Sequence, residues 1–165
     1  MRAIEDAILV AFVAAVIYTD WRWRRIPNAF TYPVMVVGLV LGAFEGLPGD
    51  IFAGGLFDHV AGLVVGFLVA YPFYAAGGLK AGDGKYLMAV GAIRGLGFLL
   101  YAAIVGALIG GVIALGVIAV RRMRPADGPS GSVMKVWIPY GVALGLGTLL
   151  GLALELSGGL SGATL

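Results

Sequence analysis

Residues 98–120, which read FLLYAAIVGALIGGVIALGVIAV, decide the fold class of this chain. The stretch contains no charged residue and is longer than the ~20 apolar residues that a helix needs to cross the hydrocarbon core of a bilayer. In lipid, every backbone N–H and C=O group must be paired within the protein, and a helix pairs its own. The stretch therefore predicts a transmembrane helix.

The rest of the chain has a similar composition. Of its 165 residues, 61% are apolar and 12% are charged, which is more apolar surface than a small soluble domain can bury. Apolar segments predict further helices at about 4–19, 29–44, 59–76, 86–93 and 136–156. We expect a single all-α transmembrane domain over residues 1–165, a polytopic bundle of about six helices.

The shortest segment, 86–93, is too short to cross a ~30 Å core at about 1.5 Å per residue. It must begin earlier, tilt or be shielded by its neighbours, or else the chain has fewer full spans. The first segment, 4–19, is expected to remain as a helix rather than be removed as a signal peptide. It carries Glu5 and Asp6, and no small-residue cleavage site follows it.

Positive charges are unevenly distributed between the loops that these spans define. With the N-terminus outside, only Arg2 and Arg94 fall on the outer side. The cytoplasmic side then holds Arg22, Arg24, Arg25, Lys80, Lys85, Arg121, Arg122, Arg124 and Lys135. Because cytoplasmic loops carry an excess of Lys and Arg, this pattern favours an N-terminus outside the cytoplasmic membrane.

Several polar residues fall on the predicted outer side. Arg94 is expected to snorkel outward, and His59 is expected to mark the outer interface. A single histidine makes a poor metal site, and a chain without cysteine has neither a disulfide nor a thiolate zinc site. No metal and no cofactor are therefore expected. Glu155 has no predicted role.

Glycines recur at a spacing of four within the apolar segments, which places both members of a pair on one helix face. Such pairs indicate close helix packing, and packing within the chain is favoured over dimerisation. The pairs are Gly38/Gly42, Gly62/Gly66, Gly91/Gly95, Gly106/Gly110, Gly141/Gly145 and Gly147/Gly151.

Two carboxylates lie at helix ends on the predicted cytoplasmic side. Asp20 closes the first helix, and Asp83 directly precedes the fourth. Two carboxylates that share a site cannot both ionise cheaply, so one keeps its proton. The ionised group can then activate a water while the protonated group hydrogen-bonds a carbonyl, which is the chemistry of an aspartic peptidase. The alternative is structural: Asp83 as a helix N-cap, and Asp20 as a solvated partner of the nearby arginines.

Three sequence elements strengthen the catalytic interpretation. Residues 20–28 (DWRWRRIPN) resemble the signature of prepilin peptidases, in which Ile-Pro-Asn follows an Asp. Residues 80–87 (KAGDGKYL) resemble that family's Gly-x-Gly-Asp-x-Lys-Leu motif, and residues 138–141 (IPYG) resemble its later Ile-Pro-(Tyr/Phe)-Gly element. The three elements occur in the family's order, so the resemblance extends over nearly the whole chain.

The resemblance implies an aspartic endopeptidase that removes a short basic leader, ending in Gly, from type IV prepilins or pseudopilins. It implies a location in the cytoplasmic membrane with the active site facing the cytoplasm, and lipid and a prepilin as partners, without nucleic acid. The long members that also methylate the new N-terminus carry a cysteine zinc site, so a short, peptidase-only member is expected. Asp20 and Asp83 would be catalytic, with Pro27, Asn28, Gly82, Lys85, Pro139 and Tyr140 supporting them or binding substrate.

The second motif departs from the family pattern, because Lys80 stands where its first Gly is expected. A Gly there would allow positive φ or a close backbone approach. Membrane proteases of the presenilin type share the aspartate chemistry but fit the first motif less well. The rival from another class is a non-enzymatic membrane subunit or a small transporter.

Overall fold

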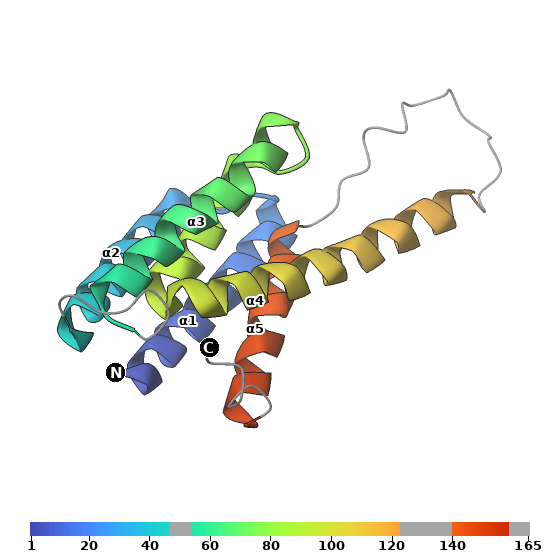
Figure 1. Ribbon diagram of the computed structural model, residues 1–165. Coiled ribbons are helices and arrows are strands. Elements are labelled where there is room, and N and C mark those ends of the chain that lie inside the picture. The colour runs from blue at the N-terminus through green and yellow to red at the C-terminus, as the bar shows by residue number, and fades with distance from the viewer. Residues whose placement is uncertain (47–53, 123–139, 159–165) are drawn as a thin grey trace.

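The computed structural model describes residues 1–46, 54–122 and 140–158, and every regular element in these ranges is a helix (Figure 1). The helices are α1 Arg2–Trp23, α2 Asn28–Glu45, α3 Leu56–Ala75, α4 Ala81–Arg122 and α5 Tyr140–Leu156. The prediction of an all-α bundle is therefore confirmed for the part of the chain that is described.

The described residues form five helices and not the six expected, because the predicted helices 86–93 and 98–120 belong to one element, α4. α4 begins at Ala81, earlier than predicted, so the short apolar segment gains the length that it lacked. The two parts are divided only by a kink at Gly95, where φ is 79° and ψ is −178°. Figure 1 shows the two parts running in clearly different directions.

Asp58, in the first turn of α3, stabilises this kink. A break in a helix leaves backbone N–H groups without their usual partners. The N–H of Leu96 donates to Asp58 Oδ1 at 2.7 Å, as it would to a capping side chain. A Cβ at position 95 would overlap Asp58 Oδ2, and the positive φ there is strained for any other residue. Gly95 thus permits both the bend and the approach of its cap.

Three of the described helices, α2, α3 and α4, are long and apolar enough to cross a membrane. α5 is apolar but has only 17 residues. α1 has 22 residues, or about 33 Å, but its charged residues reduce its hydropathy. Fewer described helices therefore meet this criterion than the six spans predicted. Leu108, Val112 and Leu115 of α4 are each at least 66% exposed, as expected for side chains that face lipid.

Glycines allow α4 to approach its neighbours closely. Gly62 of α3 faces Gly91 of α4, where a Cβ on Gly62 would lie 2.8 Å from the Gly91 carbonyl carbon. A Cβ on Gly38 of α2 would lie 2.5 Å from the carbonyl carbon of Ala92. Both separations are far below van der Waals contact, so backbone packs on backbone here. For these positions, the prediction that the glycines serve packing within the chain is confirmed.

Arg94, just before the kink, is 3% exposed. Its Nη1 lies 3.2 Å from Asp6 Oδ1 and 3.5 Å from Glu5 Oε2, and its Nη2 donates to Glu155 Oε2. The expectation that Arg94 snorkels outward is therefore wrong, because carboxylates from α1 and α5 pair its charge inside the bundle. Glu155, which had no predicted role, supplies one of them.

Candidate active site

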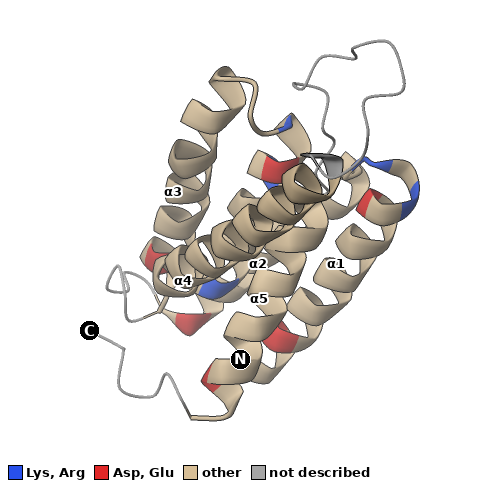
Figure 2. Cartoon of the chain, turned by 90° about the vertical axis from the view of Figure 1, so that its right-hand side faces the viewer, with Lys and Arg blue, Asp and Glu red and all other residues tan. Residues whose placement is uncertain are grey.

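Charged residues gather at two ends of the bundle (Figure 2). Asp20, near the end of α1, and Asp83, near the start of α4, lie at the same end and line one pocket of about 240 Å³. The pocket is also lined by Arg24, Arg25, Ile26, Lys80, Ala81 and Gly82. The structure thus brings together two aspartates that are far apart in the sequence.

Asp20 lies in the last turn of α1, which continues to Trp23, rather than at the helix end that the sequence predicted. The carboxylate is buried, and Oδ2 has no hydrogen-bond partner within the described residues. The Asp20 carboxylate packs against α5, where a Cβ at Gly141 would lie 2.7 Å from Asp20 Oδ2. Gly141 therefore provides the space that the Asp20 carboxylate occupies.

Asp83 lies within the first turn of α4 rather than before the helix. Its Oδ2 accepts a hydrogen bond of 2.9 Å from the backbone N–H of Lys80, the residue that precedes the helix. This is one half of a capping box, in which a side chain in the first turn reaches back to the N-cap N–H. The sequence suggested Asp83 as the N-cap residue of a helix. In the structure Asp83 instead caps α4 from within its first turn, and it also lines the pocket.

Lys80 departs from the family motif without disturbing this arrangement. Its backbone N–H bonds Asp83, and any residue except proline supplies that group. Its φ is not positive, so the conformational freedom of a glycine is not needed there. The Lys80 side chain turns toward α1, where Nζ donates to the carbonyl oxygen of Arg24 at 3.3 Å.

An aromatic stacking contact and a hydrogen bond, both made by Tyr86, hold α1, α4 and α5 together near the pocket. Phe12 of α1 stacks on Tyr86 of α4, with ring centroids 5.4 Å apart. The Tyr86 hydroxyl donates to Thr148 Oγ1 of α5 at 2.7 Å. Tyr86 follows Asp83 by three residues on α4, so the two share a helix face. The stacking therefore holds α1 against α4 within about two turns of both carboxylates.

The other residues singled out from the sequence take up different positions. Lys85 Nζ donates to Asn28 Oδ1 at 2.8 Å, which joins the two N-terminal motifs, although neither residue lines the pocket. Pro27 is the N-cap residue of α2. Gly82 lines the pocket, where its Cα packs beside Ile26. Tyr140 is the first residue of α5 and does not line the pocket, and Pro139 lies outside the described residues.

The pocket combines two buried carboxylates with basic groups. Asp20 and Asp83 are close enough to repel each other when both are ionised. Such a pair can hold one proton between two groups, which is suited to activating a water and polarising a carbonyl. Arg24, Arg25 and Lys80 add positive charge at the same pocket.

Some pocket residues were not predicted from the sequence. Ile26 lines the pocket, and Gly141 packs against Asp20 without lining it. Both belong to the quoted motifs, but nothing in those motifs indicates that Gly141 faces Asp20. That contact depends on how α1 packs against α5. Arg24 and Arg25 were interpreted as topology signals and as solvated partners of Asp20, and not as lining a shared pocket, although they follow Asp20 by only four and five residues.

A comparison with family models matched the type IV leader peptidase family over residues 7–115, a range that includes Asp20 and Asp83 and covers more than half of the chain. Neither the comparison with curated proteins nor that with solved structures gave a match. The matched range ends before the element at 138–141, so the family assignment rests on the first two motifs and their helices. The chain belongs to the type IV leader peptidase family.

Proposed function

We propose that this protein is a membrane aspartic endopeptidase that removes the basic leader from a type IV prepilin or a prepilin-like protein. One observation carries the proposal: Asp20 and Asp83, both buried and from different helices, line one pocket. The family supplies the substrate class in general form, a type IV leader.

In the proposed reaction, the ionised aspartate takes a proton from a water in the pocket, and the water oxygen bonds to the scissile carbonyl carbon. The protonated aspartate donates a hydrogen bond to the carbonyl oxygen as negative charge develops there. The amide nitrogen then accepts the proton that the first aspartate took from water, the C–N bond breaks, and the pilin leaves with a new N-terminal amine while the leader keeps a C-terminal carboxyl group. Asp20 Oδ2, which has no hydrogen-bond partner among the described residues, is available for one of these roles.

The charges at the pocket suggest how the substrate lies. Arg24, Arg25 and Lys80 disfavour entry of the leader's own basic residues. We propose that the neutral, Gly-ending part of the leader occupies the pocket and that its basic residues remain in the surrounding water.

The proposed location is the cytoplasmic membrane, with the N-terminus outside and the pocket facing the cytoplasm. The basic residues around the pocket support this orientation, because Lys and Arg are enriched at the cytoplasmic edge. The pilin helix that follows the leader would remain in lipid beside the enzyme. A peptidase without methyltransferase activity is proposed, since the chain has no cysteine for the zinc site of the longer members.

The decisive experiment uses the full-length protein purified in lipid nanodiscs and a full-length prepilin. Cleavage is followed by mass spectrometry, with expected products of the free leader and a pilin that lacks it. The control substrate is the same pilin without its leader, whose mass should not change. If folded protein leaves a panel of prepilins intact, the rival assignment as a non-enzymatic membrane subunit is preferred. A product heavier by a methyl group would contradict the peptidase-only assignment.

Gly141→Ala tests the space around Asp20. The added Cβ would lie 2.7 Å from Asp20 Oδ2, so the carboxylate must move. We expect kcat for leader cleavage to fall by up to about 100-fold, because displacements near 1 Å can have effects of that size. Steady-state cleavage kinetics provide the measurement.

The matched control for this variant is Gly145→Ala, one turn along α5. There the added Cβ would meet the side chain of Ile17 on the same neighbouring helix, and not Asp20. Equal losses of activity in the two variants would show that general crowding between α1 and α5, and not displacement of Asp20, is responsible.

A further inference from the structure

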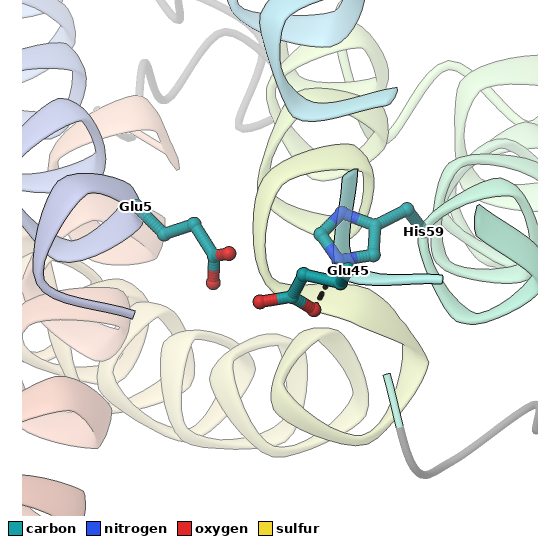
Figure 3. Close-up of side chains that lie close together, drawn as sticks. All are labelled: Glu5, Glu45 and His59. Carbon is teal, nitrogen blue, oxygen red and sulfur yellow. Dashed lines mark ion pairs between the residues drawn. The ribbon is translucent and has the colours of Figure 1, made fainter. Parts of the chain in front are cut away.

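A second cluster of ionisable side chains lies at the end of the bundle away from the aspartates. Glu5 of α1, Glu45 at the end of α2 and His59 of α3 point toward one another (Figure 3). One ligand atom from each of them lies within 4.8 Å of the other two. The three residues come from three different helices, α1, α2 and α3.

The orientation of His59 leaves a lone pair directed at this cluster. His59 lies near the start of α3 with its side chain 1% exposed, and its place at the outer interface of the membrane stays a prediction. Its Nδ1 lies 2.8 Å from the carbonyl oxygen of Ala92, which can only accept, so Nδ1 carries a hydrogen. In the neutral ring, Nε2 is then unprotonated, and it lies 3.6 Å from Glu45 Oε2. Two acceptors face each other there unless a proton or a cation lies between them.

A backbone carbonyl bonded to one ring nitrogen is the usual support of a metal-binding histidine, because it fixes the tautomer and the ring plane. Gly42 makes room for the ring, since a Cβ at that position would lie 2.6 Å from His59 Cγ. The imidazole is therefore held in place by α2 and α4 with Nε2 directed toward the glutamates.

Glu5 supplies the second observation. Its side chain is fully buried, and neither carboxylate oxygen accepts a hydrogen bond within the described residues. Arg94 Nη1 lies 3.5 Å from Glu5 Oε2, and Arg2 Nη1 lies 4.0 Å from the same oxygen. Glu5 Oε1 has neither contact, and the carboxylate points toward Glu45 (Figure 3). A buried carboxylate oxygen without a donor is costly unless a proton or a cation compensates it.

Arg94 does not neutralise this end of the bundle by itself, because it also pairs with Asp6 and Glu155. The remaining ionisable neighbour of Glu5 in the cluster is Glu45, and one oxygen of each carboxylate lies within 4.8 Å of the other. One proton would satisfy one pair of oxygens, whereas a divalent cation would satisfy both carboxylates and His59 Nε2 together.

We propose that Glu5, Glu45 and His59 bind a divalent transition-metal cation, of which Zn²⁺ and Mn²⁺ are the test cases. An imidazole with two carboxylates suits these ions better than Mg²⁺ or Ca²⁺, which prefer oxygen ligands alone. Bonds of about 2.0–2.1 Å in a tetrahedron place ligand atoms roughly 3.3 Å apart, close to the 3.6 Å between His59 Nε2 and Glu45 Oε2. The cation would connect α1, α2 and α3 and so stabilise the bundle that positions the aspartates.

The test uses full-length protein, purified without a polyhistidine tag, treated with a chelator and reconstituted in nanodiscs. Calorimetric titration with Zn²⁺ and with Mn²⁺ is expected to give one ion per chain, and saturation should raise Tm, because the ion binds only the folded protein. Glu5→Gln, Glu45→Gln and His59→Gln should each weaken metal binding at least about tenfold. Even the loss of a residue that only hydrogen-bonds a metal ligand lowers metal affinity by about that factor.

Two matched controls accompany the ligand variants. Asp6→Asn removes a carboxylate beside Glu5 that is not part of the cluster, and it should keep the binding. The double variant Asp20→Asn with Asp83→Asn removes the carboxylates at the other end and should also keep it. Binding that survives all three ligand variants, or that disappears in the double variant, would overturn the proposal.

A measurement on the unaltered protein keeps the test decisive if the ligand variants do not fold. Pulsed EPR of Mn²⁺ bound at one equivalent should show coupling to a histidine nitrogen. Such a coupling identifies His59 as the ligand, because the sequence contains a single histidine. Absence of stoichiometric binding of either ion, or of nitrogen coupling, would assign the cluster to a proton shared between Glu5 and Glu45.

Discussion

Asp20→Asn and Asp83→Asn are each expected to lower kcat/KM for leader cleavage by at least about 100-fold, because each removes a group that transfers or donates a proton. An amide can hydrogen-bond a carbonyl oxygen, but it can neither take a proton from water nor transfer one to the leaving nitrogen. The measurement is cleavage of a full-length prepilin by nanodisc-reconstituted protein, followed by mass spectrometry.

The fold should survive both substitutions, which makes the activity loss interpretable. Asn has nearly the shape of Asp, and in Asp83→Asn the amide oxygen can still accept the Lys80 N–H that begins α4. Asp20 Oδ2 has no partner to lose within the described residues. Unchanged Tm values for both variants would confirm that the chemistry, and not the packing, has been removed.

Asp6→Asn is the matched control, since it makes the same chemical change on α1 at the other end of the bundle. It should keep full cleavage activity, apart from a small effect on stability through Arg94. If Asp20→Asn and Asp83→Asn both cleave at the normal rate, the two aspartates are structural and the assignment as an aspartic peptidase fails.

Gly62→Leu is expected to have the largest effect on folding. A Cβ on Gly62 would overlap the carbonyl group of Gly91 on α4, and backbone atoms cannot turn away as a side chain can. We expect destabilisation of more than about 3 kcal/mol, at or beyond the upper end of the usual range for overpacking. Thermal unfolding and gel filtration of the detergent-solubilised protein measure this loss.

Gly111→Leu is the control for Gly62→Leu, because it places the same side chain on a helical glycine of α4. A Cβ on Gly111 would meet no atom within 4 Å, so the added side chain enters open space. This variant should keep the Tm of the unaltered protein. Equal stability of the two variants would show that the close approach of α3 and α4 does not depend on Gly62.

The apolar segments predicted the helices well where a long uncharged run had clear ends. The segment expected at 29–44 corresponds to α2, Asn28–Glu45, because Pro27 is the N-cap residue before the helix and Gly46 is the C-cap residue after it. The prediction failed between residues 76 and 98, where one kinked helix was taken for two. A glycine followed by Leu96 and Gly97 resembles a turn in sequence, and only the cap from Asp58 on α3 makes it a kink.

The pairing of Asp20 with Asp83 could be predicted in part from the sequence. Residue types and motif order predicted that both act together, and the charge pattern predicted the same side of the membrane. Their shared pocket depends on the stacking of Phe12 on Tyr86 and on the space at Gly141, which are contacts between helices. No local pattern encodes such contacts.

The sequence by itself determined that this protein is an apolar helical bundle with family motifs around two aspartates, because hydropathy, periodicity and motif order are local properties of the chain. The tertiary structure alone decided which charges are buried and what they face. It placed Arg94 among carboxylates from α1 and α5, and it directed His59 toward Glu5 and Glu45. The physical reason is that the burial of a charge depends on partners from distant segments, and these come together only when the helices pack.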